Sequence, residues 1–149
     1  MRLFRLLIWT SYLLSNGIGQ GEKIIFQSAN PFSFYHIISD LDEQKSQEVY
    51  GILHIPVGNN DEPFPLIIGV SGSKNWADHH LEYLKMYREI GFATFELHSF
   101  NSRNVKSTVG EQISVTTAMM ILDAYSALEV LIDDNRIDIN NIAITGWSL

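Results

Sequence analysis

The chain has 149 residues, of which 46% are hydrophobic and 18% are charged. This composition is typical of a globular domain with a packed core, and it excludes a disordered chain. A net charge of −7, with the Lys and Arg residues scattered, disfavours nucleic acid as a partner. The sequence contains no cysteine, which excludes disulfides, a thiolate nucleophile and a Cys-based metal site. We expect no cofactor and no metal.

The first residues of the chain have the pattern of a secretory signal. Arg2 and Arg5 precede an apolar run at 6–14, and small residues at 17–19 suit signal peptidase. We therefore expect residues 1–19 to be a signal peptide, and the mature chain to be secreted or periplasmic without stable membrane insertion. An uncleaved anchor and a buried first strand are the alternatives. The apolar run is shorter than the roughly 20 residues that cross a bilayer.

The region that follows reads as strands joined by turns. Strands are expected at 23–26, 32–37 and 49–55, with a turn at 40–43 and a polar loop at 58–63. The run at 66–70 is wholly apolar and is bounded by Pro65 and Ser71. Such a run is typical of a central strand that is covered on both faces.

Two helices with readable ends follow this strand. The first is predicted over 78–90, with Asp78 as N-cap and Gly91 in the left-handed position after its end. A strand at 92–97 then gives a β-α-β unit with a parallel crossover. A longer helix is predicted over 114–133, and a short buried strand over 142–145. The apolar stripes expected on the two helices are Leu81, Leu84, Tyr87 and Ile90, and Ala118, Ile121, Leu122, Tyr125, Leu128 and Ile132.

These elements predict an α/β fold with a mixed, mostly parallel sheet and helices on both of its faces. The last strand leads into Gly146-Trp147-Ser148-Leu149, which matches the first four positions of Gly-x-Ser-x-Gly. In that motif a sharp strand-to-helix turn holds the serine hydroxyl above the sheet. We therefore interpret Ser148 as a catalytic nucleophile. The alternative is an ordinary tight turn that contains a serine.

A possible oxyanion hole follows the central strand. The turn at 70–73 can direct a backbone N–H toward a developing negative charge, and the residue after the nucleophile supplies the second N–H. Ser73 and Leu149 are the predicted donors. Equally open is that Gly72 only permits a β-to-α turn. Trp76, in the same loop, is compatible with the wall of an acyl pocket or with a place in the core.

The chain resembles the dienelactone hydrolase branch of the α/β-hydrolase superfamily. This resemblance implies an ester, lactone or other acyl hydrolase with a Ser-acid-His triad. Two positions depart from it, because Ser71 stands where many relatives carry His and His98 stands where many carry Asp. The similar stretches, over most of 49–149, are 65–73, 91–93, 123–128 and 136–138 leading to 146–148.

In this fold the acid and the histidine of the triad follow the serine in chain order, so both are expected beyond Leu149. Residues 20–149 are then the N-terminal portion of a domain whose C-terminal half is missing. We expect this fragment to be inactive. We also expect it to be prone to aggregate, because the strand at 142–145 would be an uncovered edge.

Several other polar residues are candidates for a functional site. His98 could replace the missing base, but a solvated or loop-packing role is favoured. His79 and His80 are interpreted as the exposed start of a helix rather than a metal site, because adjacent residues point to different faces. Surface charge is favoured for three further residues that could line a mouth above the sheet: Glu96, Arg103 and Glu111.

Two functions from different classes follow. The first is a serine acyl hydrolase that acts on a small-molecule acyl substrate in its full-length form. The second is a non-catalytic, exported α/β module that binds a partner or a small ligand through the same loops. The sequence carries no signal for oligomeric state.

Overall fold

The structure, a computed structural model, describes residues 21–57 and 62–148. The predicted signal peptide, most of the polar loop and the predicted donor Leu149 lie outside the described residues. The elements are β1 (Glu22–Ala29), α1 (Phe34–Ser39), the 3₁₀ turn η1 (Leu41–Glu43), β2 (Ser46–His54), β3 (Phe64–Val70), α2 (Asp78–Glu89), β4 (Ala93–Leu97), the 3₁₀ turn η2 (Asn101–Arg103), α3 (Thr117–Leu131) and β5 (Ile137–Gly146).

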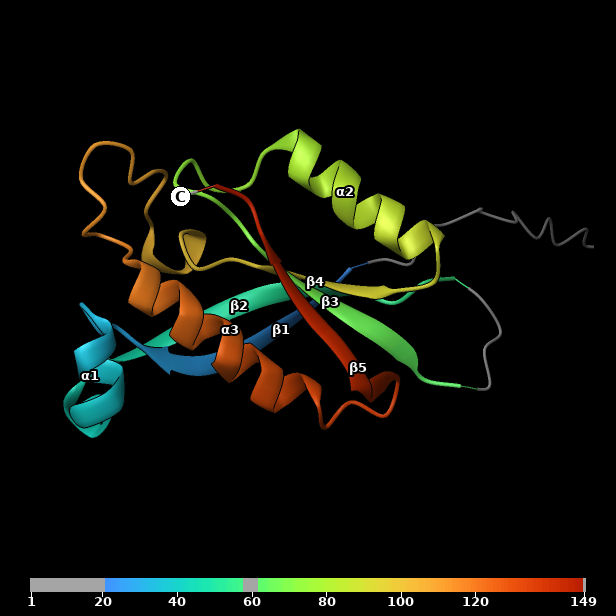
Figure 1. Cartoon of the computed structure of the whole chain (residues 1–149), viewed down its shortest axis with the longest axis horizontal. Helices are drawn as coiled ribbons and strands as arrows, with labels where there is room; N and C mark the ends of the chain where they lie inside the picture. The colour runs from blue at the N-terminus through green and yellow to red at the C-terminus, as the bar shows by residue number, and fades with distance from the viewer. Residues whose placement is uncertain (1–20, 58–61, 149) are drawn as a thin grey trace, which may run out of the picture.

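The five strands form one mixed sheet in the order β1-β2-β4-β3-β5 (Figure 1). β2 is antiparallel to both β1 and β4, whereas β3 runs parallel to β4 and β5. The predicted central strand is thus β3, and its parallel crossover to β4 is confirmed. β5 lies at the edge of the sheet, so much of the strand that we expected to be buried is exposed.

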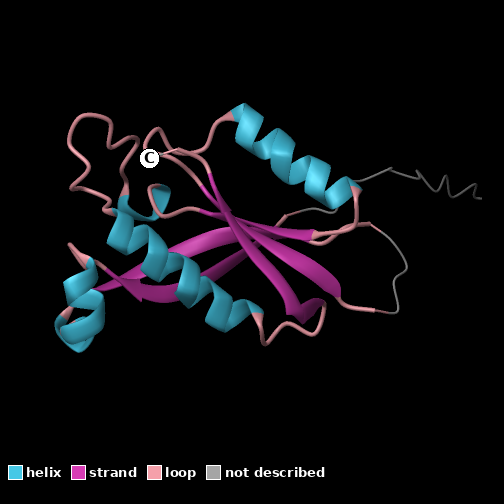
Figure 2. Cartoon of the chain, in the orientation of Figure 1, coloured by secondary structure: helices cyan, strands magenta, loops and turns pink. Residues whose placement is uncertain are grey.

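Two helices cover opposite faces of this sheet (Figure 2). Leu66 and Ile68 of β3 share a core cluster with Ala127 and Leu131 of α3. Successive strand residues point to opposite faces, and Gly69 accordingly lies against Leu84 of α2. The predicted α/β class with helices on both faces is confirmed. In the part of the chain that the structure describes, no helix is long and apolar enough to cross a membrane.

α3 turns a different face to the sheet from the one that its apolar stripe predicts. Ile121, Tyr125 and Ile132 of that stripe are exposed, whereas Ala124 and Ala127 are buried. Two physical reasons explain this. Alanines let the helix lie close to the strands, and the buried face also carries Asp123, whose charge is paired inside the protein. A count of apolar residues alone does not detect a buried charge.

The strand predicted over 32–37 is wrong, because 34–39 form helix α1. The backbone N–H of Ser33 donates to Nδ1 of His36 at 3.2 Å, which satisfies one free donor at the helix start. Tyr35 and Ile38 are exposed and do not pack on the sheet, and β-propensity depends on such packing.

The N-cap of α2 lies one residue earlier than expected. Ala77, not Asp78, occupies the N-cap, and its N–H donates to Nδ1 of His80 at 3.3 Å. Leu81 and Ile90 of the predicted stripe are exposed, and Leu84 is buried. The left-handed position of Gly91 is confirmed by its φ of +96°.

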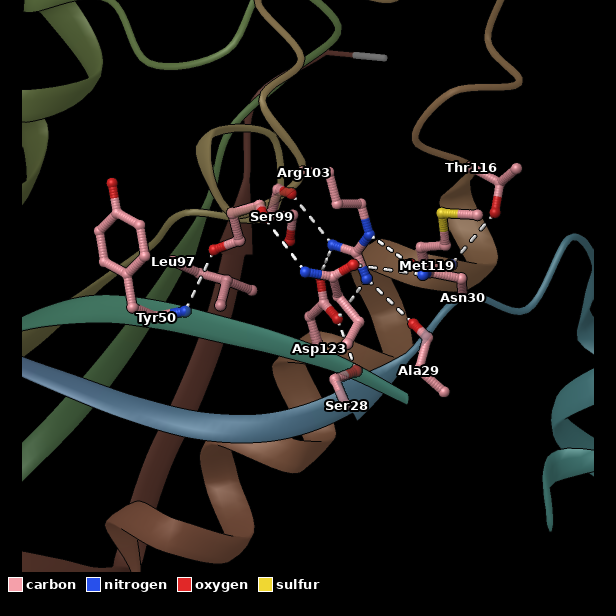
Figure 3. A network of polar contacts seen from close by, with 12 residues as sticks. Ser28, Ala29, Asn30, Tyr50, Leu97, Ser99, Arg103, Thr116, Met119 and Asp123 are labelled. Carbon is pink, nitrogen blue, oxygen red and sulfur yellow. Dashed lines mark hydrogen bonds and ion pairs between the residues drawn. The ribbon is translucent and has the colours of Figure 1, made fainter. Parts of the chain in front are cut away.

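A buried ion pair holds the β1 edge of the sheet (Figure 3). Arg103 donates two hydrogen bonds to Asp123, at 2.7 and 3.0 Å, and Ser28 Oγ donates to the same carboxylate at 2.6 Å. The remaining guanidinium donors reach Asn30 Oδ1 and the carbonyls of Ala29 and Ser99. Arg103 is therefore a buried structural residue and not a surface charge. It also lines a polar pocket with Asn30, Gln47 and Ser102, and the residues that line this pocket do not include Ser148.

Candidate functional site

Ser148 lies just beyond the carboxyl end of β5. β3 runs parallel to β5, so the carboxyl ends of the two strands lie side by side. The N–H of Trp147 donates to the carbonyl of Val70 at 3.2 Å, which ties the residue before Ser148 to the end of β3. Ser148 itself is exposed. Ligands of open α/β sheets bind at the carboxyl ends of the strands, so the position suits a reactive serine.

The turn after β3 touches the backbone of Ser148. A Cβ on Gly72 would collide with the carbonyl oxygens of Trp147 and Ser148. A glycine is therefore required here by the close approach of a second segment, in addition to any freedom that it gives to the turn. The sequence alone offered only the turn as an explanation.

Ser73, the predicted oxyanion donor, also faces this segment. Its N–H donates to the carbonyl of Ser148 at 3.3 Å, so in this structure the donor is directed at the backbone of the turn at 146–148, which we call the elbow. Its carbonyl accepts from the N–H of Thr108 at 2.8 Å and from Ser107 Oγ at 3.0 Å. The loop after β4 therefore fixes the position of Ser73. The roles of Ser73 and Leu149 as donors remain predictions.

A cavity of about 430 Å³ opens beside Ser148, between α3 and β5. Its walls are mostly apolar, and the hydroxyl-bearing residues Ser71 and Thr117 lie among them. Among the described residues, those that line it include no acidic or basic side chain. The lining is Val70, Ser71, Thr117, Met120, Ile121, Ala124, Tyr125, Ile144, Gly146, Trp147 and Ser148.

On the α2 side, the indole of Trp147 sits among three other rings. His80 stacks on it with a centroid distance of 5.0 Å, Trp76 meets it edge-on at 5.6 Å, and Tyr83 lies 6.4 Å away. Trp76 donates its indole N–H to the carbonyl of Leu97 at 2.8 Å. Trp76 is thus a packing residue of this cluster and does not line the cavity.

His80 is buried, so the prediction of an exposed histidine pair at the helix start is wrong for this residue, although His79 is exposed. Burial lowers the pKa of His80, and the neighbouring His79 adds to the effect. The neutral ring is the form that can accept the N–H of Ala77. No group of three His, Asp or Glu side chains in the described ranges could hold a metal ion.

His98 is committed to packing within the loop after β4. Its Nε2 lies 2.9 Å from Glu96 Oε1, and its Nδ1 lies 3.0 Å from Asn101 Nδ2. Its ring stacks on Tyr50 with a centroid distance of 4.8 Å. Both ring nitrogens are engaged away from Ser148, which supports the loop-packing interpretation over a triad role. Glu96 is correspondingly a partner of His98 and not a free surface charge.

Glu111 is an exposed residue that caps its own loop. Its Oε2 accepts the N–H groups of Ile113 and Ser114 at 2.9 and 3.0 Å. The hydrogen bond from Ile113 lowers the pKa of Glu111. The residue is therefore a surface charge, as expected, with a local structural role.

Sequence reasoning missed the environment of Trp147. The signal that could have found it is the density of ring-bearing residues around the start of α2, namely Trp76, His79, His80 and Tyr83. A second signal is Gly69, because a glycine in a buried apolar strand marks a close approach by a large side chain. A Cβ there would lie 3.0 Å from Trp76 Cη2 and 3.3 Å from Trp147 Cζ3.

No protein-family model and no curated protein sequence matches the chain. Solved structures do resemble it. A dienelactone hydrolase-like promiscuous phosphotriesterase from metagenomic libraries matches at 16% identity and a TM-score of 0.58, over 87% of this chain and 50% of its own. A putative dienelactone hydrolase from Klebsiella pneumoniae matches at 13% identity and a TM-score of 0.52, over 85% of this chain and 50% of its own.

An acylaminoacyl peptidase from Pyrococcus horikoshii matches at 15% identity and a TM-score of 0.56, over 89% of this chain and 20% of its own. The chain thus spans about half the length of the dienelactone hydrolase structures that it matches. At such identities the likeness concerns the fold. The chain has the fold that its sequence predicts, that of the dienelactone hydrolase-like α/β-hydrolases, over about half the length of such a protein.

Proposed function

We propose that Ser148 is the nucleophile of a serine acyl hydrolase that acts on an ester, lactone or related bond of a small molecule. One observation carries the proposal. Ser148 follows Gly146 at the carboxyl edge of a parallel strand pair, in contact with the turn after β3. A strand that leads directly into Gly-x-Ser is the first half of the strand-turn-helix context of a nucleophile elbow, which supports the proposal.

The chemistry follows from that position. Ser148 Oγ would attack the acyl carbon, a histidine base would take the hydroxyl proton, and the oxygen of the acyl group would gain negative charge. The N–H groups of Ser73, in the turn after β3, and of Leu149, the residue that follows the nucleophile in the sequence, would hold that charge. For this to occur, the N–H of Ser73 must exchange its present partner, the carbonyl of Ser148, for the substrate oxygen.

The acid and the base of the triad are proposed to come from the part of the parent fold that this chain does not span. Support comes from the matched dienelactone hydrolase structures, of which this chain covers 50%, and from three of the five histidines of the described region. His36, His80 and His98 each engage a ring nitrogen with a neighbour of their own loop or helix start. The 149-residue chain alone is therefore proposed to be inactive.

A serine-directed fluorophosphonate probe tests the assignment. The complete gene product that contains this sequence should be labelled, and labelling should disappear in Ser148→Ala. Ser39→Ala is the matched control, because Ser39 is an exposed serine at the end of α1. Labelling that persists in Ser148→Ala, or that is absent from correctly folded wild-type protein, would contradict the proposal. The 149-residue chain should remain unlabelled.

The second candidate is a non-catalytic module that binds a small ligand. The apolar, uncharged cavity beside Ser148 favours it, as does the internal hydrogen bond that now occupies the N–H of Ser73. An apolar ligand that binds with equal affinity to wild type and Ser148→Ala, in protein that the probe does not label, would decide for the module.

Export of the protein is a separate proposal, supported by the pattern of residues 1–19. Mass spectrometry of the mature protein should find Gln20 at its N-terminus. An intact N-terminus on protein recovered outside the cytoplasm would contradict cleavage.

A further inference from the structure

The indole of Trp147 is held more firmly than an exposed strand end requires. β5 has neighbours on one side only, and its residues Ile139 and Ile144 are exposed. Trp147, three residues beyond Ile144 toward the C-terminus, instead lies within ring contact of Trp76, His80 and Tyr83. The strand is therefore anchored at the end that carries Ser148.

Two of the rings around Trp147, those of Trp76 and His80, are themselves held by hydrogen bonds. Trp76 is bonded through its indole N–H to the end of β4, at 2.8 Å from the carbonyl of Leu97. The N–H of Ala77 donates to Nδ1 of His80 at 3.3 Å, which restrains the ring at the start of α2. A ring that is already restrained by a hydrogen bond loses little further entropy when it contacts a neighbour. Trp76 and His80 therefore form a rigid seat for the indole of Trp147.

The loop that supplies Trp76 is rigid for the same reason. Asn75 has a φ of 65°, and its Oδ1 accepts the N–H of Trp76 at 2.9 Å. Its Nδ2 donates to Asn101 Oδ1 at 2.6 Å, and its N–H donates to the carbonyl of Gly72 at 2.8 Å. One short loop thus joins Gly72, which touches the elbow backbone, to Trp76, which touches the elbow side chain.

The backbone of the sheet makes room for this arrangement. Gly69 faces the two tryptophans, and a Cβ there would be tighter against Trp76 and Leu84 than nearly all real contacts, at 3.0 and 3.1 Å. The carboxyl-terminal end of β3, where Gly69 lies, is therefore shaped around the indole rings. A feature that needs a glycine, a left-handed asparagine and two fixed rings is more specific than general core filling.

From this geometry we propose that Trp147 is a positioning residue, whose indole, stacked on His80 and packed against Trp76, sets the position of Ser148 for attack. The inference rests on the proposed function of Ser148. It assigns a role to the variable residue of Gly-x-Ser, beyond the turn that the flanking residues permit. A shift of the hydroxyl by about 1 Å is enough to slow such a reaction by up to roughly a hundredfold.

The test is steady-state hydrolysis of p-nitrophenyl acetate by the complete gene product and its variants. Trp147→Ala should lower kcat by about tenfold or more, with KM changed by less than about twofold, because position and not substrate binding is lost. Trp147→Phe, which keeps a ring in the seat, should recover most of kcat. Tyr35→Ala is the matched control, since Tyr35 is an exposed aromatic of α1, 64% accessible.

A second measurement reports on the seat without reference to activity. Trp76 and Trp147 meet edge-on at 5.6 Å, so their transitions should couple and give an exciton signal in circular dichroism. Trp76→Ala should abolish that signal and lower kcat, because it removes a ring that packs against Trp147, and it replaces Trp147→Ala as the deciding variant if the latter does not fold.

The outcomes separate the two proposals. A wild-type protein that neither hydrolyses the ester nor labels with fluorophosphonate overturns the proposed function and the positioning role with it. Active wild type with unchanged kcat in the folded variant overturns the positioning role alone. A rise in KM at constant kcat also overturns it, because that result assigns Trp147 to the substrate wall.

Discussion

The two edges of the sheet are held by different kinds of interaction. At the β1 edge, Arg103 and Asp123 form a pair whose side chains are 5% and 0% exposed, and every guanidinium donor has an acceptor (Figure 3). At the β5 edge, the strand is exposed along much of its length, and packing of rings and backbone around Trp147 fixes its end. The candidate nucleophile belongs to the second edge. Global stability and the geometry of Ser148 should therefore respond to different substitutions.

The largest effect is expected at the β1 edge. Asp123→Ala leaves the buried guanidinium of Arg103 without its counter-charge, which should cost about 3–5 kcal/mol of unfolding free energy. Chemical denaturation followed by circular dichroism measures this loss. Glu22→Ala is the control, because the Arg136–Glu22 pair is about half exposed and should contribute about 0–1 kcal/mol. A loss in Asp123→Ala no larger than in the control would show that the two edges do not differ as described.

The next effect should appear where the two turns meet. Gly72→Ala places a methyl group against the carbonyls of Trp147 and Ser148, so the elbow or the turn must move, at a cost of about 1–3 kcal/mol. Gly146→Ala is the matched control, since the nearest atom to its Cβ, Val70 O, would be 3.8 Å away. Unfolding midpoints of the two variants make the comparison. Equal midpoints would mean that the close approach at Gly72 is not a constraint.

The open edge itself should govern self-association. Ile144 is 48% exposed on β5, and its burial between associating chains would contribute about 1.5 kcal/mol. Ile144→Lys removes that gain and adds a charge to the edge, so the concentration at which the 149-residue chain aggregates should rise roughly tenfold. Light scattering against concentration measures it. Ile38→Lys, on α1, is the control, and an equal shift there would indicate general solubility rather than the edge.

The smallest effect is a pH dependence that involves His80. Burial lowers the pKa of His80 in the folded chain, so the unfolded chain binds the proton more readily. The contribution of His80 to the free energy of unfolding is thus complete above the unfolded-state pKa of about 6.5. It is lost as the pH falls through the lower pKa of His80 in the folded chain. Urea midpoints at pH 7.5 and pH 5 should differ more in wild type than in His80→Gln. An equal difference in both would remove His80 from the account.

The sheet was predictable from local patterns because β3 and β4 are short, apolar and bounded by turn formers. Their parallel crossover followed from the intervening α2. The phase of α3 was not predictable, since it depends on Asp123, whose partner Arg103 lies on a separate loop 20 residues away. α1 was mistaken for a strand because its side chains favour strands while no neighbouring strand is available to pair with it.

In the candidate site, too, features that depend on local sequence were predictable and features that depend on long-range contacts were not. Ser148 was found from a short motif and its place after a strand. The function of Gly72 and the seat of Trp147 were not found, because both depend on segments about 75 residues apart in the chain coming into contact. A single sequence gives the chemistry of such residues but not their proximity.

The late position of β5 in the chain has a consequence for synthesis. Sixty-six residues separate the end of β3 at Val70 from the start of β5 at Ile137. At typical translation rates β3 therefore waits about 3–13 s with one side of its backbone unpaired. Pro65 lies within β3, at the irregularity in β3–β5 pairing, and has no N–H to offer a foreign strand. We expect Pro65 to protect the nascent chain during this interval, before the elbow reaches Gly72.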